Sequence, residues 1–565
     1  MLSQALADGS SAVTALGTIA GTVISVAAVG SLAAGLTGKA LRRRRTARAH
    51  LLKTGWQAHA EVDKTGALIY NESSTDFKDV VLTVACVLHQ YEARQDIGLL
   101  RAKQDRVWPT PLLHEILGSM SDTGASDPVD LAHHASPHTV QATFTDGRGY
   151  WFRSDGRIER VKTLVLWAEK TRASTLQKYF GPRSPFTKQY SVKVTVYPFD
   201  RIEELERAFT ELVRTGRTSG DAPVPDIIVG PHDWIGRVAR EDSVLEPPAG
   251  TQRMRSVAPS AVRALSRGRR LYAVPYVFDT VALIRNNALT GRTQPMPESA
   301  EEAIRLGREA LAAKGIQDGI PFALQIGAPN ASGDAGDPYH MWPLFSSAGG
   351  SFFGLRHDHE DGFADPDDWR PGFTEAFVEL ARLGQGANGD RALDPALSRA
   401  EALAAFLAGR APYFQCSSRA LASIRERGMD VTVAPAPRLG AGRPEPMVSV
   451  YGFFIYRGAP NLPAARDLLT AYVQTASAGL DLQRHQQLVP VQEEAMTAVA
   501  AGDPVLRPYV EQVRTGFVMP SYPEMREAWR LLGRTEYDVL VGGEDPREVA
   551  ERVADRGWEL LRDVR

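Results

Sequence analysis

Short apolar runs alternate with longer helix-forming stretches from residue 161 to residue 565, and this alternation most limits what the chain can fold into. Runs such as 163–167 and 192–197 have the length of buried strands, whereas 202–214 and 300–314 are helical stretches. Strands that are separated by helices build sheets with helices on both faces. Because the region is too long for the core of one sheet, the pattern predicts an α/β fold with two lobes.

The expected elements of this region follow from the same reading. The expected strands are 163–167, 192–197, 226–229, 272–277, 281–285, 322–326, 413–415, 431–435 and 448–456. The expected helices are 202–214, 300–314, 370–382, 398–408, 464–475, 503–515, 522–532 and 546–561.

The composition is that of an ordinary globular protein and argues against nucleic acid as a partner. Hydrophobic residues make up 43% of the 565 residues, and the formal net charge is −2. Such a balance gives no long-range attraction to nucleic acid. The two cysteines, Cys86 and Cys416, are too few for a disulfide framework.

An uncharged stretch from 9 to 38 precedes a basic cluster near the start of the chain. About 20 apolar residues suffice for a helix to cross a bilayer, so a retained single-pass transmembrane helix is the main prediction. A cleaved signal would begin with Lys or Arg, which residues 1–10 lack; a signal and an amphipathic surface segment are the alternatives. The basic residues that follow are Lys39, Arg42, Arg43, Arg44, Arg45 and Arg48. By the positive-inside rule, this side of the span faces the cytoplasm.

The segment from 51 to 160 has the character of a separate, mainly-β unit. Asp146-Gly147 and Asp155-Gly156 separate β-type runs, which is a hairpin signal because Gly accepts a positive φ. We expect a small β-sandwich-like domain with a helical insert near 111–120 and a polar loop over 121–137. The predicted domains are therefore 1–50 with the membrane helix and basic flank, 51–160, and the two-lobed region 161–565.

Several short motifs within 161–565 occur in an order that is typical of one family. They are 163–167, 192–196, 225–228 with His232-Asp233, 272–275 with 283–286, Asp337-Pro338-Tyr339 with 342–344 and 349–350, 404–406 with 409–410, and Met519 with Trp529. In this order they resemble the maltose-type solute-binding proteins of ABC transporters, which form extracellular solute-binding protein family 1. The resemblance implies a periplasmic-binding-protein-like fold, whose lobes close about a hinge on a solute.

The resemblance also implies a set of ligand-contacting residues. A sugar needs aromatic rings for its C–H faces, and carboxylates or amides for its hydroxyls. The residues that the resemblance places at or beside the ligand cleft are Asp233, Trp234, Asp279, Asp337, Tyr339, His340, Arg419, Met519 and Trp529.

Several of these residues have a second interpretation. Trp529 could be a core residue of an amphipathic helix, Asp279 could bond to the hinge backbone, and Asp233 could cap the helix that begins at Trp234. Arg419 could pair with an anionic ligand group or be a surface arginine.

The chain also departs from the family pattern. Gly230 and Arg419 stand where the family has platform tryptophans, Gly533 replaces an arginine, and His340 stands where an aromatic is expected. An early charged pair after the first strand aligns loosely with Glu169-Lys170. The loss of platforms argues against a long maltodextrin.

Two functions remain open, and both are non-catalytic. The first is the substrate-binding component of an ABC-type transporter for a carbohydrate or glycoside, which requires exposure outside the cell and a permease partner. The second is a membrane-anchored sensor or adaptor with a signalling partner, which the arginine cluster favours by placing the soluble part in the cytoplasm. No P-loop, nucleophile elbow or His-Glu-x-x-His motif occurs. No enzyme activity, cofactor or metal is therefore predicted, and the histidines of 133–138 and 357–361 are interpreted as solvated loops.

Overall fold

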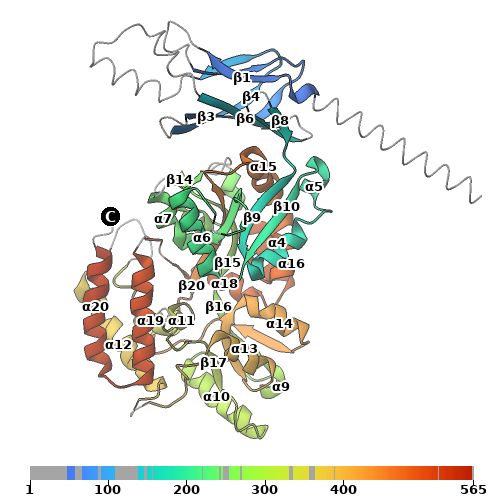
Figure 1. The fold of residues 1–565 in the computed structure, drawn as a ribbon. Helices are drawn as coiled ribbons and strands as arrows, with labels where there is room; N and C mark the ends of the chain where they lie inside the picture. Colours follow the sequence, from blue (N-terminus) through green and yellow to red (C-terminus); the bar gives the residue numbers. More distant parts are fainter. Residues whose placement is uncertain are drawn as a thin grey trace, which may run out of the picture. The chain divides into compact units, whose positions relative to one another are not determined.

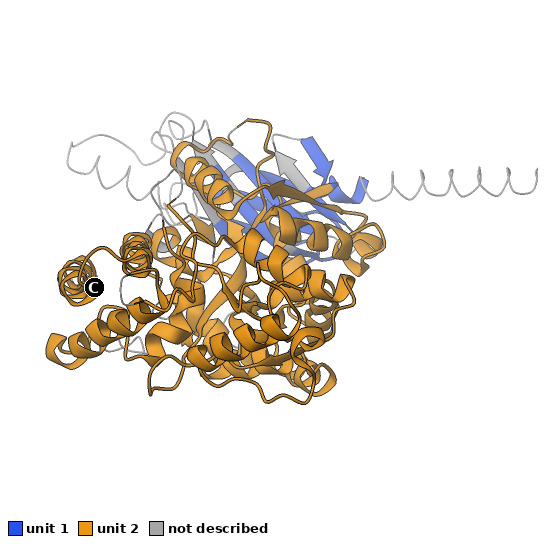
Figure 2. Ribbon diagram, turned by 90° about the horizontal axis from the view of Figure 1, so that it is seen from below, with its two compact units in different colours: residues 1–162 blue, residues 163–565 orange. Residues whose placement is uncertain are grey.

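The computed structural model describes residues 47–57, 66–86, 91–108, 138–145, 149–154 and 157–562, the last range with gaps at 219, 241–242, 246–252, 268–269, 330–334, 356–362, 387–388, 520 and 523. The predicted membrane span 9–38, most of its basic flank, the insert near 111–120 and the loop 121–137 lie outside these ranges. Within them, no helix combines the length and apolarity that a bilayer crossing requires. The chain divides into two compact units, 1–162 and 163–565, which Figure 2 colours separately.

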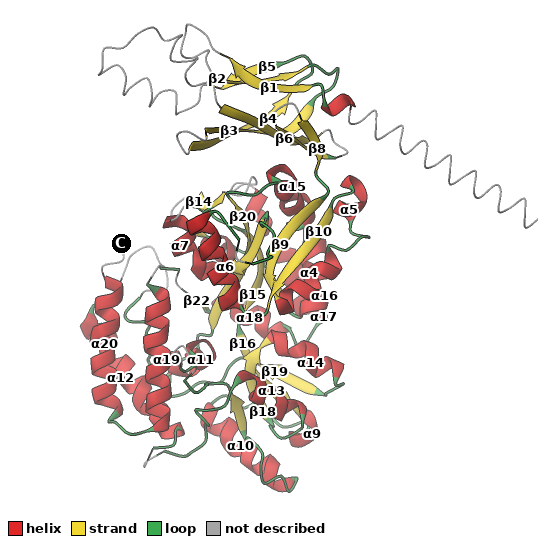
Figure 3. Cartoon of the chain, in the orientation of Figure 1, coloured by secondary structure: helices red, strands yellow, loops and turns green. Residues whose placement is uncertain are grey.

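The described strands of the first unit form two antiparallel sheets (Figure 3). One has the order β1 (Leu52–Gln57), β2 (Gly66–Asn71), β5 (Asp105–Trp108). The other has the order β4 (Tyr91–Leu100), β3 (Phe77–Cys86), β6 (His138–Thr145), β7 (Tyr150–Ser154), β8 (Arg157–Arg160). Leu52 and Ile69 of the first sheet share one core with Leu82, Val84 and Phe144 of the second.

The first lobe of the second unit is built on a mixed sheet (Figure 1). Its main strands, in spatial order, are β10 (Lys193–Phe199), β9 (Thr163–Glu169), β11 (Ile227–Pro231), β20 (Met447–Tyr456), β15 (Val274–Asp279) and β21 (Val489–Pro490). Two short strands, β12 (Val244–Leu245) and β22 (Phe517–Val518), also pair with β20. The helices of this lobe include α4 (Lys170–Tyr179), α6 (Ile202–Thr215), α7 (Ile235–Arg240), α15 (Leu462–Tyr472), α16 (Ala476–Gln486), α17 (Glu493–Gly502) and α18 (Arg507–Thr515).

The second lobe has a smaller sheet with the order β17 (Phe322–Leu324), β18 (Tyr413–Ser417), β16 (Val281–Asn286), β19 (Val431–Ala434). Its helices include α10 (Ala300–Ala313), α11 (Pro338–Ser347), α13 (Arg399–Leu407) and α14 (Leu421–Glu426). The long helices α12 (Pro366–Leu383), α19 (Met525–Val541) and α20 (Pro546–Arg562) pack against one another at its side (Figure 1). The predicted α/β fold with two lobes is confirmed.

The polypeptide passes between the lobes where β15 continues into β16, where 435–446 lead from β19 to β20, and where 519–524 lead from β22 to α19. Thr280 alone separates β15 from β16, and its Oγ1 donates a 2.8 Å hydrogen bond to the carbonyl of Met447 at the start of β20. The buried ring of His232 connects the crossing that begins at Met519 to strand β20. Its Nε2 donates to the Met519 carbonyl (2.5 Å), and its Nδ1 accepts from the Val450 amide (3.1 Å). These bonds hold the crossings together at one hinge.

Candidate ligand-binding site

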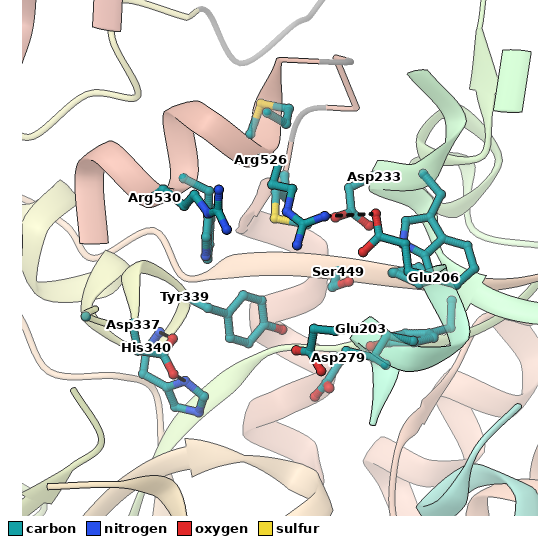
Figure 4. A pocket seen from close by; sticks show the side chains of 18 of the residues that line it. Glu203, Glu206, Asp233, Asp279, Asp337, Tyr339, His340, Ser449, Arg526 and Arg530 are labelled. Carbon is teal, nitrogen blue, oxygen red and sulfur yellow. Dashed lines mark hydrogen bonds and ion pairs between the residues drawn. The ribbon is translucent and has the colours of Figure 1, made fainter. Parts of the chain in front are cut away.

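A cavity of about 570 Å³ is lined by residues of both lobes and of the crossings between them (Figure 4). Elements far apart in sequence supply its wall: the segment after β11, the end of β15, the start of α11, the turn after β18 and the first turns of α19. All the predicted site residues lie along it: Asp233, Trp234, Asp279, Asp337, Tyr339, His340, Arg419, Met519 and Trp529. Their contact with a ligand stays a prediction.

Asp279 is the last residue of β15 and lies at the hinge, where it contacts arginines of both lobes. Its Oδ2 is 3.0 Å from Nε of Arg419, which follows β18, and 3.9 Å from Nη2 of Arg172 on α4. Burial raises the pKa of this carboxyl, but Arg419 and Arg172 outweigh burial and hold the pKa below its usual value. Asp279 is thus a buried ionic link between the lobes, and Arg419 is no plain surface arginine.

Arg172 supports this link from the first lobe, although sequence reasoning did not select it. Its side chain is only 3% exposed, its guanidinium carbon lies 3.5 Å from the centroid of the Tyr451 ring, and Glu169 pairs with it at 3.3 Å. The only sequence signal was the loosely aligned Glu169-Lys170 pair. Lys170 instead bonds to Asp200 on the surface.

Asp337 caps a helix rather than offering a free carboxylate to the cavity. It is the N-cap of α11, where Oδ1 accepts the His340 amide at 3.2 Å and Oδ2 lies 3.0 Å from Nδ1 of the His340 ring. The amide nitrogen of Gln325 also donates to Oδ2. Burial raises the pKa of Asp337, but the contacts with His340 and Gln325 bring it below its usual value. The carboxylate therefore positions α11 and the imidazole.

Tyr339 extends into the cavity, with its hydroxyl toward the side that carries Asp279 and Glu203 (Figure 4). Within the described residues, this hydroxyl has no hydrogen-bond partner. Trp529 lines the same cavity and is partly buried against the core of the second lobe, with its ring centroid 6.5 Å from that of Phe352. Its side chain thus belongs to the core and to the cavity wall together.

Trp234 is a core residue and not an open platform. Its side chain is 4% exposed, and its ring centroid lies 6.1 Å from that of Phe209 and 6.4 Å from that of Phe454. Although it contributes to the cavity wall, these contacts do not leave its ring faces free to stack on a ligand.

Asp233 lies within the short 3-10 turn His232–Trp234, whose N-cap is Pro231, so the capping role considered for it is wrong. Burial and the charge of Glu206 raise the pKa of Asp233 to about 7. Its Oδ1 has no hydrogen-bond partner in the described part of the chain. Glu206 itself pairs with Arg237 at 2.7 Å and is 3.9 Å from Arg526 (Figure 4).

Four of the arginines that line the cavity were not predicted: Arg237 on α7, Arg399 on α13, and Arg526 and Arg530 on α19. The expected family arginine falls on Gly533, one turn further along α19. A Cβ on Gly533 would lie 2.6 Å from the carbonyl oxygen of Ala335, so the loop before α11 approaches the helix too closely for a side chain there. Arg526 and Arg530, four residues apart, bring positive charge to the cavity from the preceding turns.

Metal chemistry finds no support in the described ranges, where no cluster of His, Cys, Asp and Glu could hold an ion. His133, His134 and the run 357–361 lie outside those ranges.

Comparison with known proteins agrees with this architecture. Residues 183–504 match the family model of the bacterial extracellular solute-binding proteins, and because the match covers more than half of the chain, the chain belongs to that family. The resemblance predicted from the motifs is thereby confirmed. The chain is also similar to the maltotriose-binding protein of Pyrococcus abyssi, with 23% identity over 339 residues that cover 59% of this chain and 68% of the relative.

Proposed function

We propose that residues 163–565 bind a small hydroxylated solute, a carbohydrate or a glycoside, as the substrate-binding component of an ABC-type transporter. The observation that carries the proposal is the cavity of about 570 Å³, whose walls come from both lobes and meet at Asp279 on the hinge. Cavities of this size suit small molecules, and few polar groups suffice to orient them. Family membership and the similarity to a protein named for maltotriose binding support the same class of ligand.

The side chains of the cavity have the mixture that a sugar requires. Tyr339, Tyr522 and Trp529 present partly buried aromatic rings, while Asp233 and the arginines present hydrogen-bonding groups. Aromatic rings cover C–H faces, and charged groups form strong hydrogen bonds with hydroxyls. Because Trp234 is withdrawn into the core, the aromatic surface is small, which favours a short ligand over a long oligosaccharide.

Closure of the lobes is the expected binding motion. The three crossings form one hinge, and Asp279 contacts a guanidinium on each side of it. A ligand that touches both walls would stabilise the closed state and exclude water. A permease would then distinguish the closed, loaded form from the open one.

Thermal unfolding and calorimetric titration with neutral sugars, sugar acids, glycosides and oligosaccharides test the proposal. Micromolar affinity corresponds to about −8 kcal/mol, and ligand at about 100 times its Kd should add about 2.7 kcal/mol to stability. Tyr339→Phe removes a hydroxyl without a partner in the described structure. It should therefore weaken binding by about 1 kcal/mol and leave the unliganded melting curve nearly unchanged. Absence of any stabilisation across the panel would contradict the proposal.

A second candidate, a membrane-anchored ligand sensor or adaptor, rests on the basic residues 39–48 that follow the uncharged stretch 9–38. By the positive-inside rule they favour a cytoplasmic location for the rest of the chain. The same cleft would then report a solute to a signalling partner. The two candidates share the binding step and differ in the side of the membrane.

A further inference from the structure

The second-lobe side of the cavity carries a guanidinium that has no hydrogen-bond or ion-pair partner among the described residues. Arg399 is the first residue of α13, lines the cavity and is exposed. Across the described ranges, its side chain forms no hydrogen bond and no ion pair. The start of a helix disfavours a positive charge because the helix dipole is positive there. The position of Arg399 is thus not explained by local stability.

Arg419 faces the same cavity from the turn after β18. Its Nε lies 3.0 Å from Oδ2 of Asp279 and 3.4 Å from Oγ of Ser417. Its two terminal nitrogens form no hydrogen bond with described residues, and its side chain is 24% exposed. The two terminal nitrogens of Arg419 can therefore donate to a planar or tetrahedral anion in the cavity.

The two arginines act on each other. The positive charge of Arg419 is the main cause that lowers the pKa of Arg399. Although the residue as a whole is exposed, partial desolvation of its guanidinium adds to this effect, and together they outweigh the opposing effects of Asp279 and Asp337. The carboxylate of Asp337 already accepts from His340 and Gln325, and that of Asp279 is shared by Arg172 and Arg419. The protein thus brings two cations together, and no carboxylate of the described part of the chain is bonded to Arg399.

On the side of the cavity that carries Glu206, in contrast, the arginines do have a carboxylate partner. Arg237 and Arg526 both have Glu206 as a carboxylate partner, at 2.7 Å and 3.9 Å. Tyr339 also lines the cavity. Burial is the main cause that raises the pKa of its phenol, the negative charge of Asp279 raises the pKa further, and the positive charge of Arg419 lowers it. Its hydroxyl, which lacks a partner in the described structure, is therefore in electrostatic range of the Arg419 side.

We propose that the solute bound in this cleft carries an anionic group, a carboxylate or a phosphate, that Arg399 and Arg419 hold between them. Guanidinium groups bind such anions through paired, charge-assisted hydrogen bonds. The remaining hydroxyls of the solute contact the carboxylates and aromatic rings of the cavity. This assignment rests on the proposed function and narrows its ligand to acidic sugars, either sugar acids or sugar phosphates.

Calorimetric titration of the full chain with matched probes tests this assignment: glucose against glucuronate and glucose 6-phosphate, and galactose against galacturonate and galactose 6-phosphate. We expect at least one acidic probe to bind about tenfold to a hundredfold more tightly than its neutral partner. Stronger binding of the uronate identifies a carboxylate as the anion, and stronger binding of the sugar phosphate identifies a phosphate. The preference should weaken as salt increases, because exposed charges are screened.

Arg399→Gln should abolish the preference for the acidic probe, because it weakens binding of that probe far more than binding of the neutral sugar. Arg399→Lys, which keeps the charge but loses the fork, should restore part of it. Arg427→Gln is the matched control, since Arg427 is an exposed arginine of the same lobe outside the cavity. It should retain the preference.

The outcomes separate this inference from the proposed function. If neutral sugars bind as tightly as acidic ones, or if Arg399→Gln keeps the preference, the anionic assignment is wrong while sugar binding stands. If none of these probes binds while a neutral glycoside or oligosaccharide of the wider panel does, the anionic assignment is wrong and the proposed function stands; if nothing in the wider panel binds, both fail.

Discussion

The indole ring of Trp234 lies directly against the backbone of Gly230: a Cβ atom on Gly230 would come within 2.4 Å of a ring carbon. The family pattern has an aromatic platform at position 230, and here the space beside it is filled from position 234 instead. Because that ring also contacts Phe209 and Phe454, an aromatic surface that could face the ligand has become part of the core of the first lobe.

Gly230→Ala should destabilise the protein by about 1–3 kcal/mol, because the added methyl collides with a ring that cannot move away from its core neighbours. Trp234→Leu should itself be costly, yet in its background the cost of Gly230→Ala should shrink, since the colliding ring is gone. Urea unfolding of the two single variants and the double variant measures this coupling. Strictly additive effects would show that the two residues do not compete for the same space.

Asp233 should make stability depend on pH. Its pKa in the folded protein is about 7, against an ordinary value of 3.8, so the folded state holds a proton that the unfolded state has lost. The folded state binds more protons between these values, and stability therefore falls as pH rises from about 4 to about 7. The charged groups nearest to it are Glu206 on α6 and Arg237 on α7, with Arg526 of α19 beside Glu206.

Asp233→Asn removes this titration. Relative to the unmodified protein, the variant should gain about 2 kcal/mol of stability at pH 8 and little at pH 4.5. The gain at pH 8 is smaller than the whole pKa shift of Asp233 would give, because the asparagine amide is still a buried polar group. Asp221→Asn, the same change on an exposed residue, serves as the control. Denaturant melts across this pH range measure both, and a gain that does not vary with pH would refute the role given to Asp233.

The overall fold was largely predictable from sequence, because strand-length apolar runs such as 281–285 and 448–456 and the longer helices depend on local pattern. Helix α11 was missed, since Pro338 and Pro343 obscure it. It begins there because Asp337 caps it and Pro is tolerated in a first turn.

The site was only partly predictable. Motif order brought the expected residues to one cavity, but Arg172, Arg399 and Arg526 resemble solvated helix residues in sequence. Their proximity depends on how two lobes meet, which no local pattern encodes. The ion pairs of Asp279 with Arg172 and Arg419, and the hydrogen bond from Gln325 to Asp337, likewise join residues that are far apart in the sequence.

Asp279→Ala should destabilise the protein as well as weaken binding. Its removal leaves Arg172, whose side chain is 3% exposed, with Glu169 as its remaining carboxylate partner, and leaves Arg419 beside Arg399 without compensation. Removing one partner of a buried ion pair commonly costs about 3–5 kcal/mol. Urea melts of the unliganded protein measure the loss, and Asp200→Ala, which breaks the exposed pair with Lys170, should cost much less because solvent screens that pair. Equal losses for the two variants would argue against a structural role for Asp279 at the hinge.

The side of the membrane separates the transporter component from the sensor, and two features of the chain predict opposite sides. The family is one of extracellular solute-binding proteins, whereas the basic residues 39–48 beside the uncharged stretch 9–38 favour the cytoplasm. Charge within about 15–20 residues of a span end biases orientation, but long following domains can be translocated regardless of it. The transport proposal therefore expects residues 163–565 outside the cytoplasm. A protease added to intact cells stripped of their wall should then digest this region, while a cytoplasmic marker protein stays whole. Protection of the region until the cells are lysed would contradict transport and support the sensor, in which the same cleft reports a solute inside the cell.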